Sequence, residues 1–268
     1  MIAMMYHDIE SADRLNEKRG TSAYLYVTPA EAFRRQLELI RSLGLRVSTW
    51  SGYLQAMRTG RADLSRTVIL TFDDGHESVE SVAMPIMNEF GFAGTTQVIS
   101  GFVGKPNKYT LNDAQLRRLR QAGWDIGGHG FNHIVLTELD DETLAFELRE
   151  AKRVLEQVLR EPVEMMSIPH GPYSRRVRSA IINAGYQAAF CSSPGINQTG
   201  TDRFSLRRMT ITQAVDLPTF RQIVTLDPCF YMKEGLRRFG YRTLQRLIGS
   251  KRYEIVRASL LRILAMSK

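Results

Sequence analysis

Residues 67–75 read Thr-Val-Ile-Leu-Thr-Phe-Asp-Asp-Gly, an apolar run that ends in two adjacent carboxylates and a glycine. Such a run predicts a buried parallel strand, and residues just past the carboxyl end of such a strand face the site in βα folds. Asp73 and Asp74 repel each other, so both stay charged only beside a cation or strong donors. The alternative is a simple Asp-Gly turn, which weakens if metal-type ligands occur elsewhere in the chain.

Such ligands occur in residues 127–136, Gly-Gly-His-Gly-Phe-Asn-His-Ile-Val-Leu, where His129 and His133 are four positions apart. On a helical turn these positions share a face, so both imidazoles could reach one ion. The chain has only five histidines, and two fall here, which argues against coincidence. One carboxylate with two imidazoles leaves coordination positions open for water, which is typical of a catalytic metal site.

These segments, together with Ile168-Pro169-His170-Gly171 and an opening Met4-Met5-Tyr6-His7, resemble the successive motifs of the polysaccharide deacetylases. This is the NodB-homology group, carbohydrate esterase family four. The resemblance extends over residues 1–226. Strands alternate with helices along this region, which predicts parallel βαβ units in either an open doubly wound sheet or a closed barrel. The resemblance implies the latter, an α/β fold with an irregular seven-stranded (β/α) barrel.

The resemblance also implies the chemistry, which is metal-dependent hydrolysis of N-acetyl groups from N-acetylhexosamine units of a polysaccharide, oligosaccharide or glycolipid. Asp74, His129 and His133 are the expected ligands of one divalent metal, Zn²⁺ in the first place, with Co²⁺ or Ni²⁺ as alternatives. Asp73 is the expected general base. By analogy with the family, the backbone N–H of His170 is the expected oxyanion donor.

Two departures from the family pattern affect the catalytic residues. Many members have an arginine at the position of Ser167, and Arg208 is our candidate for the missing charge. No histidine follows His170, so the usual late general acid is absent. His7 is the first candidate for that role and His170 the second, and the alternative for each is a hydrogen-bonded structural histidine.

The third motif also supplies the expected substrate-binding residues, Gly171 and Tyr173. The Tyr173 ring could form a pocket wall against a sugar. The alternative, that it packs against a neighbouring helix, is at least as well supported by the pattern.

The charge of the chain is uneven. The net charge is +8, and residues 233–268 contribute ten basic and two acidic residues, which equals the whole imbalance. We therefore divide the chain into a deacetylase domain, 1–226, and a basic amphipathic helical tail, 227–268. The tail predicts either peripheral contact with anionic membrane or a helical pair docked on the barrel. Aromatic residues that could stack on bases are sparse, so we expect no nucleic-acid partner.

Two cysteines make no disulfide framework, and neither a signal peptide nor a membrane-spanning run is evident. We therefore expect a cytoplasmic protein, with the tail as a possible contact to the inner face of the membrane.

Two functional alternatives stay open. Two histidines and one carboxylate also describe non-haem iron oxygenases, although the aspartate doublet argues against one. The chain could also be a catalytically impaired glycan-binding or membrane-associated scaffold of the same fold.

Overall fold

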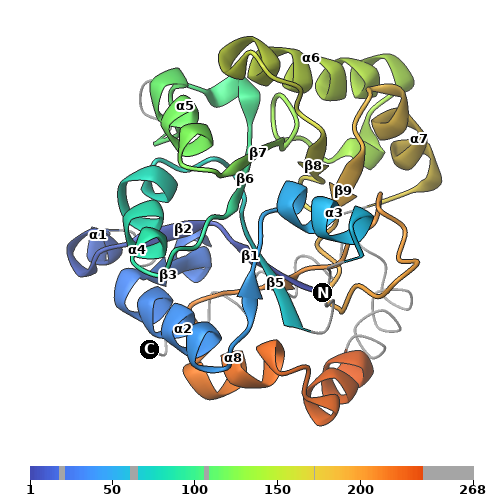
Figure 1. The fold of residues 1–268 in the computed structure, drawn as a ribbon. Helices are drawn as coiled ribbons and strands as arrows, with labels where there is room; N and C mark the ends of the chain where they lie inside the picture. The colour runs from blue at the N-terminus through green and yellow to red at the C-terminus, as the bar shows by residue number, and fades with distance from the viewer. Residues whose placement is uncertain (18–21, 61–65, 106–108, 172, 238–268) are drawn as a thin grey trace.

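The computed structural model describes residues 1–17, 22–60, 66–105, 109–171 and 173–237. Its centre is a curled sheet in which every strand pairing is parallel and the order is β10-β1-β5-β6-β7-β8-β9, with β4 added beside β5 (Figure 1). The strands are β1 (Ile2–Tyr6), β4 (Arg46–Val47), β5 (Thr67–Phe72), β6 (Thr95–Val98), β7 (Asp125–Gly128), β8 (Met165–Ser167), β9 (Ala188–Phe190) and β10 (Met209–Thr210). The predicted irregular seven-stranded barrel is confirmed.

The sheet closes through one short segment. Leu206 forms a parallel bridge with Phe190 of β9, and three residues later Met209 pairs with Met4 of β1. The backbone therefore crosses from the last strand of the sheet to the first between residues 206 and 209. This places Arg208, one of the two residues between these pairings, at the seam of the barrel.

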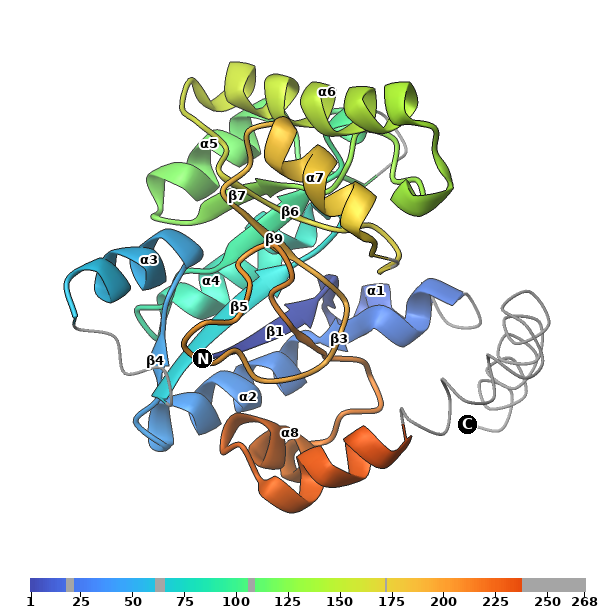
Figure 2. The same cartoon turned by 90° about the vertical axis from the view of Figure 1, so that its right-hand side faces the viewer.

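Helices surround the sheet, with α6 and α7 on one side and α2 and α8 on the opposite side (Figures 1 and 2). Their bounds are α2 (Ala30–Ser42), α3 (Trp50–Arg58), α4 (Met84–Asn88), α5 (Asp113–Gln121), α6 (Asp141–Leu159), α7 (Arg175–Asn183) and α8 (Leu217–Val224), with a π-helical turn η3 (Val79–Ala83) before α4 and short 3₁₀ turns η4 (Ser100–Phe102) and η5 (Leu136–Glu138). Asn112, Ser174 and Asp216 cap α5, α7 and α8, as their positions before apolar periodic segments predict. Residues 228–237 are also helical.

The core has two parts because strand side chains alternate. Ile2 and Met4 of β1 and Val68 and Leu70 of β5 pack outward against the helices. A smaller cluster fills the inside of the barrel, and Trp50 and Tyr53 of α3 close it at the end where the strands begin; its members are Met1, Ala3, Trp50, Tyr53, Ile69, Met165, Ala188, Phe190 and Leu206. This apolar plug leaves the carboxyl ends of the strands for polar side chains.

Residues 8–26 are polar and have no hydrophobic period, which is typical of one long loop. The structure differs: residues 8–10 form β2 (Asp8–Glu10), which pairs in parallel with β3 (Val27–Pro29), and the described part between them holds α1 (Ala12–Glu17) and the 3₁₀ turn η1 (Ser22–Tyr26). The polar sequence has no period because β2 is only three residues long, too short to show alternation.

None of the described helices is long and apolar enough to cross a membrane. The predicted amphipathic helices after residue 237 lie outside the described residues, and the division at residue 226 stays a prediction.

Candidate active site

The aspartate doublet lies at the carboxyl end of β5, where the predicted strand ends. The Asp73 N–H still donates to Tyr6 O of β1 at 2.9 Å, so Asp73 continues the sheet. Asp74 then turns the chain with a φ of 70°, a left-handed conformation that is uncommon for residues other than glycine. The two neighbouring carboxylates consequently point in different directions. Asp73 is buried, and the Asp74 side chain keeps 38% exposure.

The structure brings Asp74 together with both predicted histidines. Asp74 Oδ1 lies 3.4 Å from His129 Nε2 and 3.4 Å from His133 Nε2, and the three ligand atoms lie within 4.8 Å of one another. The predicted Asp–His–His convergence is therefore present.

These contacts fit a metal better than hydrogen bonds. A separation of 3.4 Å is long for a hydrogen bond, and Asp74 Oδ1 is buried with no hydrogen-bond partner among the described residues. Ligands held about 2.0–2.1 Å from a tetrahedral ion lie roughly 3.3–3.4 Å apart. One carboxylate and two imidazoles are also a donor set that Zn²⁺ accepts. The residues present thus fit a divalent ion.

Ser167 orients the first imidazole. His129 Nδ1 lies 3.0 Å from Ser167 O and 2.6 Å from Ser167 Oγ. A carbonyl oxygen can only accept, so a proton on Nδ1 satisfies it and leaves Nε2 unprotonated toward Asp74. The serine that replaces the family's usual arginine therefore contacts a predicted metal ligand.

The second imidazole lies on an irregular loop, so the predicted helical turn is wrong. Residues 129–135 have no helical assignment, and Gly130 and His133 both take left-handed conformations, with φ of 73° and 59°. The loop still brings the two imidazole rings together, with centroids 4.9 Å apart. The loop also contacts α6, where Glu147 accepts hydrogen bonds from the backbone N–H groups of Phe131 and Asn132.

Arg208 pairs with Asp73 at the barrel seam. Its Nη1 lies 2.6 Å from Asp73 Oδ1 and its Nη2 lies 2.7 Å from Oδ2, and both residues are buried. Nη1 also donates to Thr71 Oγ1 and Nε to Cys191 O. The guanidinium suggested as a substitute for the missing motif arginine is thus next to the predicted base.

The protonation of these groups follows from burial and neighbouring charge. Burial would raise the pKa of Asp73, but the Arg208 guanidinium and the imidazoles of His129 and His7 outweigh it and hold that pKa below its usual value. The pKa of Asp74 is likewise lowered, because the neighbouring imidazoles outweigh its burial. Burial, with the charge of His129 next, lowers the pKa of His133 to about 4. His133 is therefore neutral at pH 7, as a metal ligand must be.

The two candidate acids take different positions. His7 follows β1, its ring lies 4.8 Å from the Tyr26 ring, and its buried Nδ1 has no hydrogen-bond partner among the described residues. Burial lowers the pKa of His7. His170 is exposed, with its ring 4.4 Å from the His133 ring, and its Nε2 donates to His133 O at 3.1 Å. Both histidines therefore lie next to the cluster, His7 as a largely buried side chain and His170 as an exposed one.

The two expected substrate-binding residues are less well placed. Gly171 adopts a φ of 95°, and its N–H donates to Pro169 O at 2.7 Å, so this amide serves the turn. Tyr173 packs against the outer core, its hydroxyl is buried, and burial raises its pKa to about 12. These contacts favour the packing interpretation of Tyr173, and substrate binding by either residue stays a prediction.

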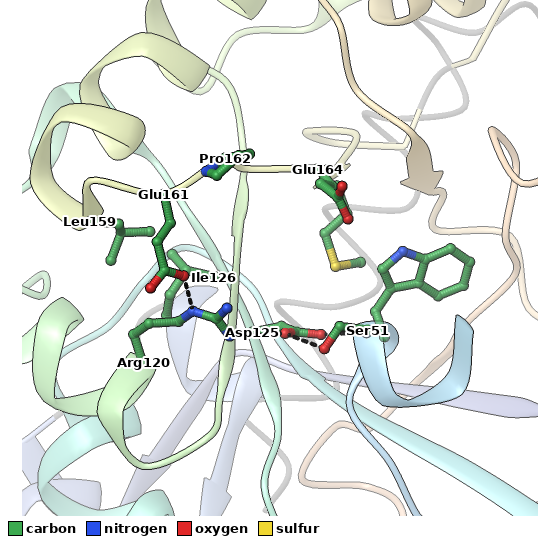
Figure 3. Close-up of a pocket in the computed structure, with 10 residues that line it drawn as sticks. Ser51, Arg120, Asp125, Ile126, Leu159, Glu161, Pro162 and Glu164 are labelled. Carbon is green, nitrogen blue, oxygen red and sulfur yellow. Dashed lines mark hydrogen bonds and ion pairs between the residues drawn. The ribbon is translucent and has the colours of Figure 1, made fainter. Parts of the chain in front are cut away.

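A second cluster and a cavity lie outside this centre. Asp8, Glu10 and His76 also bring ligand-type atoms within 4.8 Å, but Asp8 Oδ1 already contacts His76 Nδ1 and accepts a hydrogen bond from Ser78 Oγ. A cavity of about 70 Å³ lies where β7 and β8 begin, beside the Ser51–Asp125 and Arg120–Glu161 contacts (Figure 3). That end of a βα barrel serves stability, and the cavity is at the opposite end from the doublet.

The fold and the site together define a parallel α/β barrel with a carboxylate–imidazole cluster at the carboxyl ends of its strands. The family model for polysaccharide deacetylase matches residues 60–189 of this chain. The resemblance seen in the sequence motifs is therefore confirmed.

The chain is also similar to named relatives in sequence and to solved structures in fold. The Bacillus subtilis (strain 168) protein YxkH, named for this family, is 22% identical over 217 residues, which are 81% of this chain and 73% of that protein. The poly-β-1,6-N-acetyl-D-glucosamine N-deacetylase of Staphylococcus aureus (strain MSSA476) is 21% identical over 206 residues, covering 70% and 71%. The fold is shared with the Streptococcus pyogenes deacetylase PplD, solved with acetate (TM-score 0.74, 22% identity, coverage 84% and 97%), and with IcaB from Ammonifex degensii (TM-score 0.68, 20%, coverage 84% and 96%).

Proposed function

We propose that this protein is a metal-dependent N-deacetylase that removes acetyl groups from N-acetylhexosamine units of a glycan. The observation that carries the proposal is the convergence of Asp74, His129 and His133, with the predicted base Asp73 next in the chain. The family model supports the reaction class, and the name of the S. aureus relative supports an N-acetylglucosamine polymer as the class of substrate.

The ion would be held by Asp74 Oδ1 and the Nε2 atoms of the two histidines, and Zn²⁺ suits this donor set best. When bound, such an ion supplies Lewis-acid polarisation of the acetyl carbonyl and lowers the pKa of a coordinated water. Ser167 fixes His129 in the tautomer that leaves Nε2 free.

Asp73 accepts the proton of the attacking water. Its pKa is held low, so it is ionised at neutral pH, and each carboxylate oxygen that accepts from Arg208 has a second lone pair available. Arg208 thus keeps the base charged and fixed in a buried position. The backbone N–H of His170 is the proposed donor to the oxyanion, since no described residue accepts a hydrogen bond from it.

The departing amine needs a proton. His7 is the first candidate, because its Nδ1 is unengaged within the described residues and its ring is buried beside the two aspartates, whose charges act on it. His170 is the second candidate, because its Nε2 is engaged with the His133 carbonyl. A His7→Ala variant that keeps metal and substrate affinity but loses turnover would support the first assignment.

The test of the function is acetate release from purified protein supplied with Zn²⁺, Co²⁺ or Ni²⁺, measured on a panel of N-acetylated oligosaccharides that differ in linkage. Asp73→Asn should keep the metal and lose turnover, whereas His129→Ala should lose both. Glu161→Gln, at the opposite end of the barrel, is the matched carboxylate control and should behave as wild type.

No acetate release from any sugar with any of the metals would refute the proposed enzymatic activity. That result would favour the alternative, a catalytically impaired glycan-binding or membrane-associated scaffold. Equal activity in Asp73→Asn would refute the assignment of the base. Membrane contact through residues 227–268, and a position at the inner face of the membrane, are proposals that rest on the charge pattern alone.

A further inference from the structure

Glu147 is a charged residue on the buried face of α6. The buried residues of this helix include Leu144, Glu147, Leu148 and Ala151, and Glu147 is 1% exposed. A buried carboxylate is costly unless it is hydrogen-bonded or paired. No ion pair in the described part of the chain involves Glu147, so its hydrogen bonds must account for its burial.

Within the described residues, every hydrogen bond of its carboxylate goes to the loop between the two candidate histidine ligands. Oε2 accepts from Phe131 N at 3.0 Å and from Asn132 N at 2.9 Å, and Oε1 accepts from Asn132 Nδ2 at 2.5 Å. Bonds from N–H groups to a charged carboxylate are stronger than bonds between neutral groups. One helix side chain thus holds two consecutive peptide groups next to His133.

The two histidines are held independently. His129 directly follows β7, and its ring is oriented by Ser167 of β8; neither of these constraints involves Glu147. His133 follows Asn132 directly and takes a left-handed φ of 59°, a conformation that persists only where its surroundings impose it. On the other side of the loop, Gly101 N donates to Phe131 O, and a Cβ at Gly101 would lie 2.3 Å from that oxygen. The loop is therefore clamped between η4 and α6.

We propose that Glu147 is a positioning residue that fixes His133 for metal binding, acting through the peptide groups of Phe131 and Asn132. The inference rests on the proposed metal-dependent function. It assigns Glu147 no contact with substrate or metal.

The primary measurement is the dissociation constant for Zn²⁺, obtained by chelator competition on the full chain. Glu147→Ala should weaken binding about 10–100-fold, the usual effect of losing a group that orients a ligand. Glu147→Gln should lose less than about tenfold, because its amide oxygen can still accept from both backbone N–H groups and the Asn132 amide can turn to meet its nitrogen. Glu150→Ala, three residues further along α6 at a half-buried glutamate paired with Arg153, should bind as wild type.

Leu148→Ala separates positioning from general destabilisation. Leu148 is the next residue of α6 and fully buried, so its truncation should lower the melting temperature and leave the Zn²⁺ dissociation constant unchanged. If Leu148→Ala weakens Zn²⁺ binding as much as Glu147→Ala, the effect is one of stability and the inference is wrong.

A double-mutant cycle tests the route of the effect. Because Glu147 acts through His133, Glu147→Ala should cost nothing further in a His133→Ala background, and the Co²⁺ visible spectra of the two single variants should be alike. Additive losses would overturn the inference. Wild-type protein that binds no Zn²⁺ would instead overturn the proposed function itself, whereas wild-type binding matched by Glu147→Ala would overturn only the role of Glu147.

Discussion

Replacing Arg208 by methionine tests the electrostatics of the site most directly. Arg208 is 0% exposed and holds both oxygens of Asp73, at 2.6 and 2.7 Å. Methionine fills much of the same volume but removes the charge and leaves the buried Asp73 carboxylate without its counterion. Breaking a buried pair in this way costs about 3–5 kcal/mol in the free energy of unfolding. That is a large part of the roughly 5–15 kcal/mol that stabilises an ordinary domain.

The cost should depend on pH with a definite sign. In the wild type the pKa of Asp73 is below its usual value. The ion pair therefore stabilises the fold at pH values above about 3.9, the pKa of the carboxyl group in the unfolded chain, and this stabilisation is lost as the pH falls through the pKa of Asp73 in the folded state. In the variant no guanidinium offsets the effect of burial. The pKa of Asp73 in the folded state therefore rises above about 3.9. The variant is then penalised increasingly as the pH rises. The difference in unfolding free energy should be largest near pH 7 and narrow toward pH 4.

The assay is urea denaturation of metal-free wild type and Arg208→Met, at pH 7 and at pH 4.5. A matched variant is Arg153→Met, which removes an exposed arginine paired with Glu150 on α6 and should change the midpoint little at either pH. A loss below about 1 kcal/mol at pH 7, or a loss of the same size at both pH values, would refute the reasoning. The double variant Asp73→Asn/Arg208→Met should lose less than the sum of the single changes, by about 0.5–3 kcal/mol.

Three further predictions follow from the same geometry. Asp73→Asn should keep Zn²⁺ and lower kcat about 10²–10⁴-fold, measured by acetate release, because the proton acceptor is gone. Ser167→Ala should weaken Zn²⁺ binding about 10–100-fold in chelator competition, because it removes the Oγ contact to His129 Nδ1. Tyr109 is 62% exposed, and its ring stacks on the ring of His76, which is two residues after Asp74 in the chain. We expect Tyr109 to contact a sugar ring, so Tyr109→Ala should raise KM for an oligosaccharide with kcat little changed.

Much of the fold follows from local signals. The β-branched run before Asp73, the capping residues Asn112, Ser174 and Asp216, and the glycines after helices predict most elements to within a few residues. The failures have physical reasons. Thr28 before Pro29 suggests a helix cap, but it lies in β3, because pairing with β2 determines the conformation of that segment. The β2–β3 pair joins segments separated by residues 11–26, and no short window of sequence contains that information.

The candidate site divides in the same way. Asp74, His129 and His133 could be grouped from residue chemistry, because few side chains suit a divalent metal and parallel strands bring their carboxyl ends together. The conformation that joins them could not be predicted. A spacing of four positions between the histidines suggests a helical face, whereas the chain uses two left-handed residues and an anchor on a distant helix. The one available signal was Glu147 itself, a charged residue at a position of α6 where the apolar stripe calls for a hydrophobic one.

The position of Arg208 shows why the seam of the barrel matters for chemistry. Arg208 is 135 residues from Asp73 along the chain, yet it meets Asp73 because residues 206–209 bridge β9 and β1. In an open sheet β10 would be an edge strand, and an arginine beside it would be exposed to water. Closure instead places it inside the barrel, where a buried cation has to find a counterion, and Asp73 is the carboxylate it contacts there. Closure of the sheet and ionisation of the proposed base are therefore coupled, so a change that loosens the seam should raise the pKa of Asp73 even where no residue of the cluster is altered.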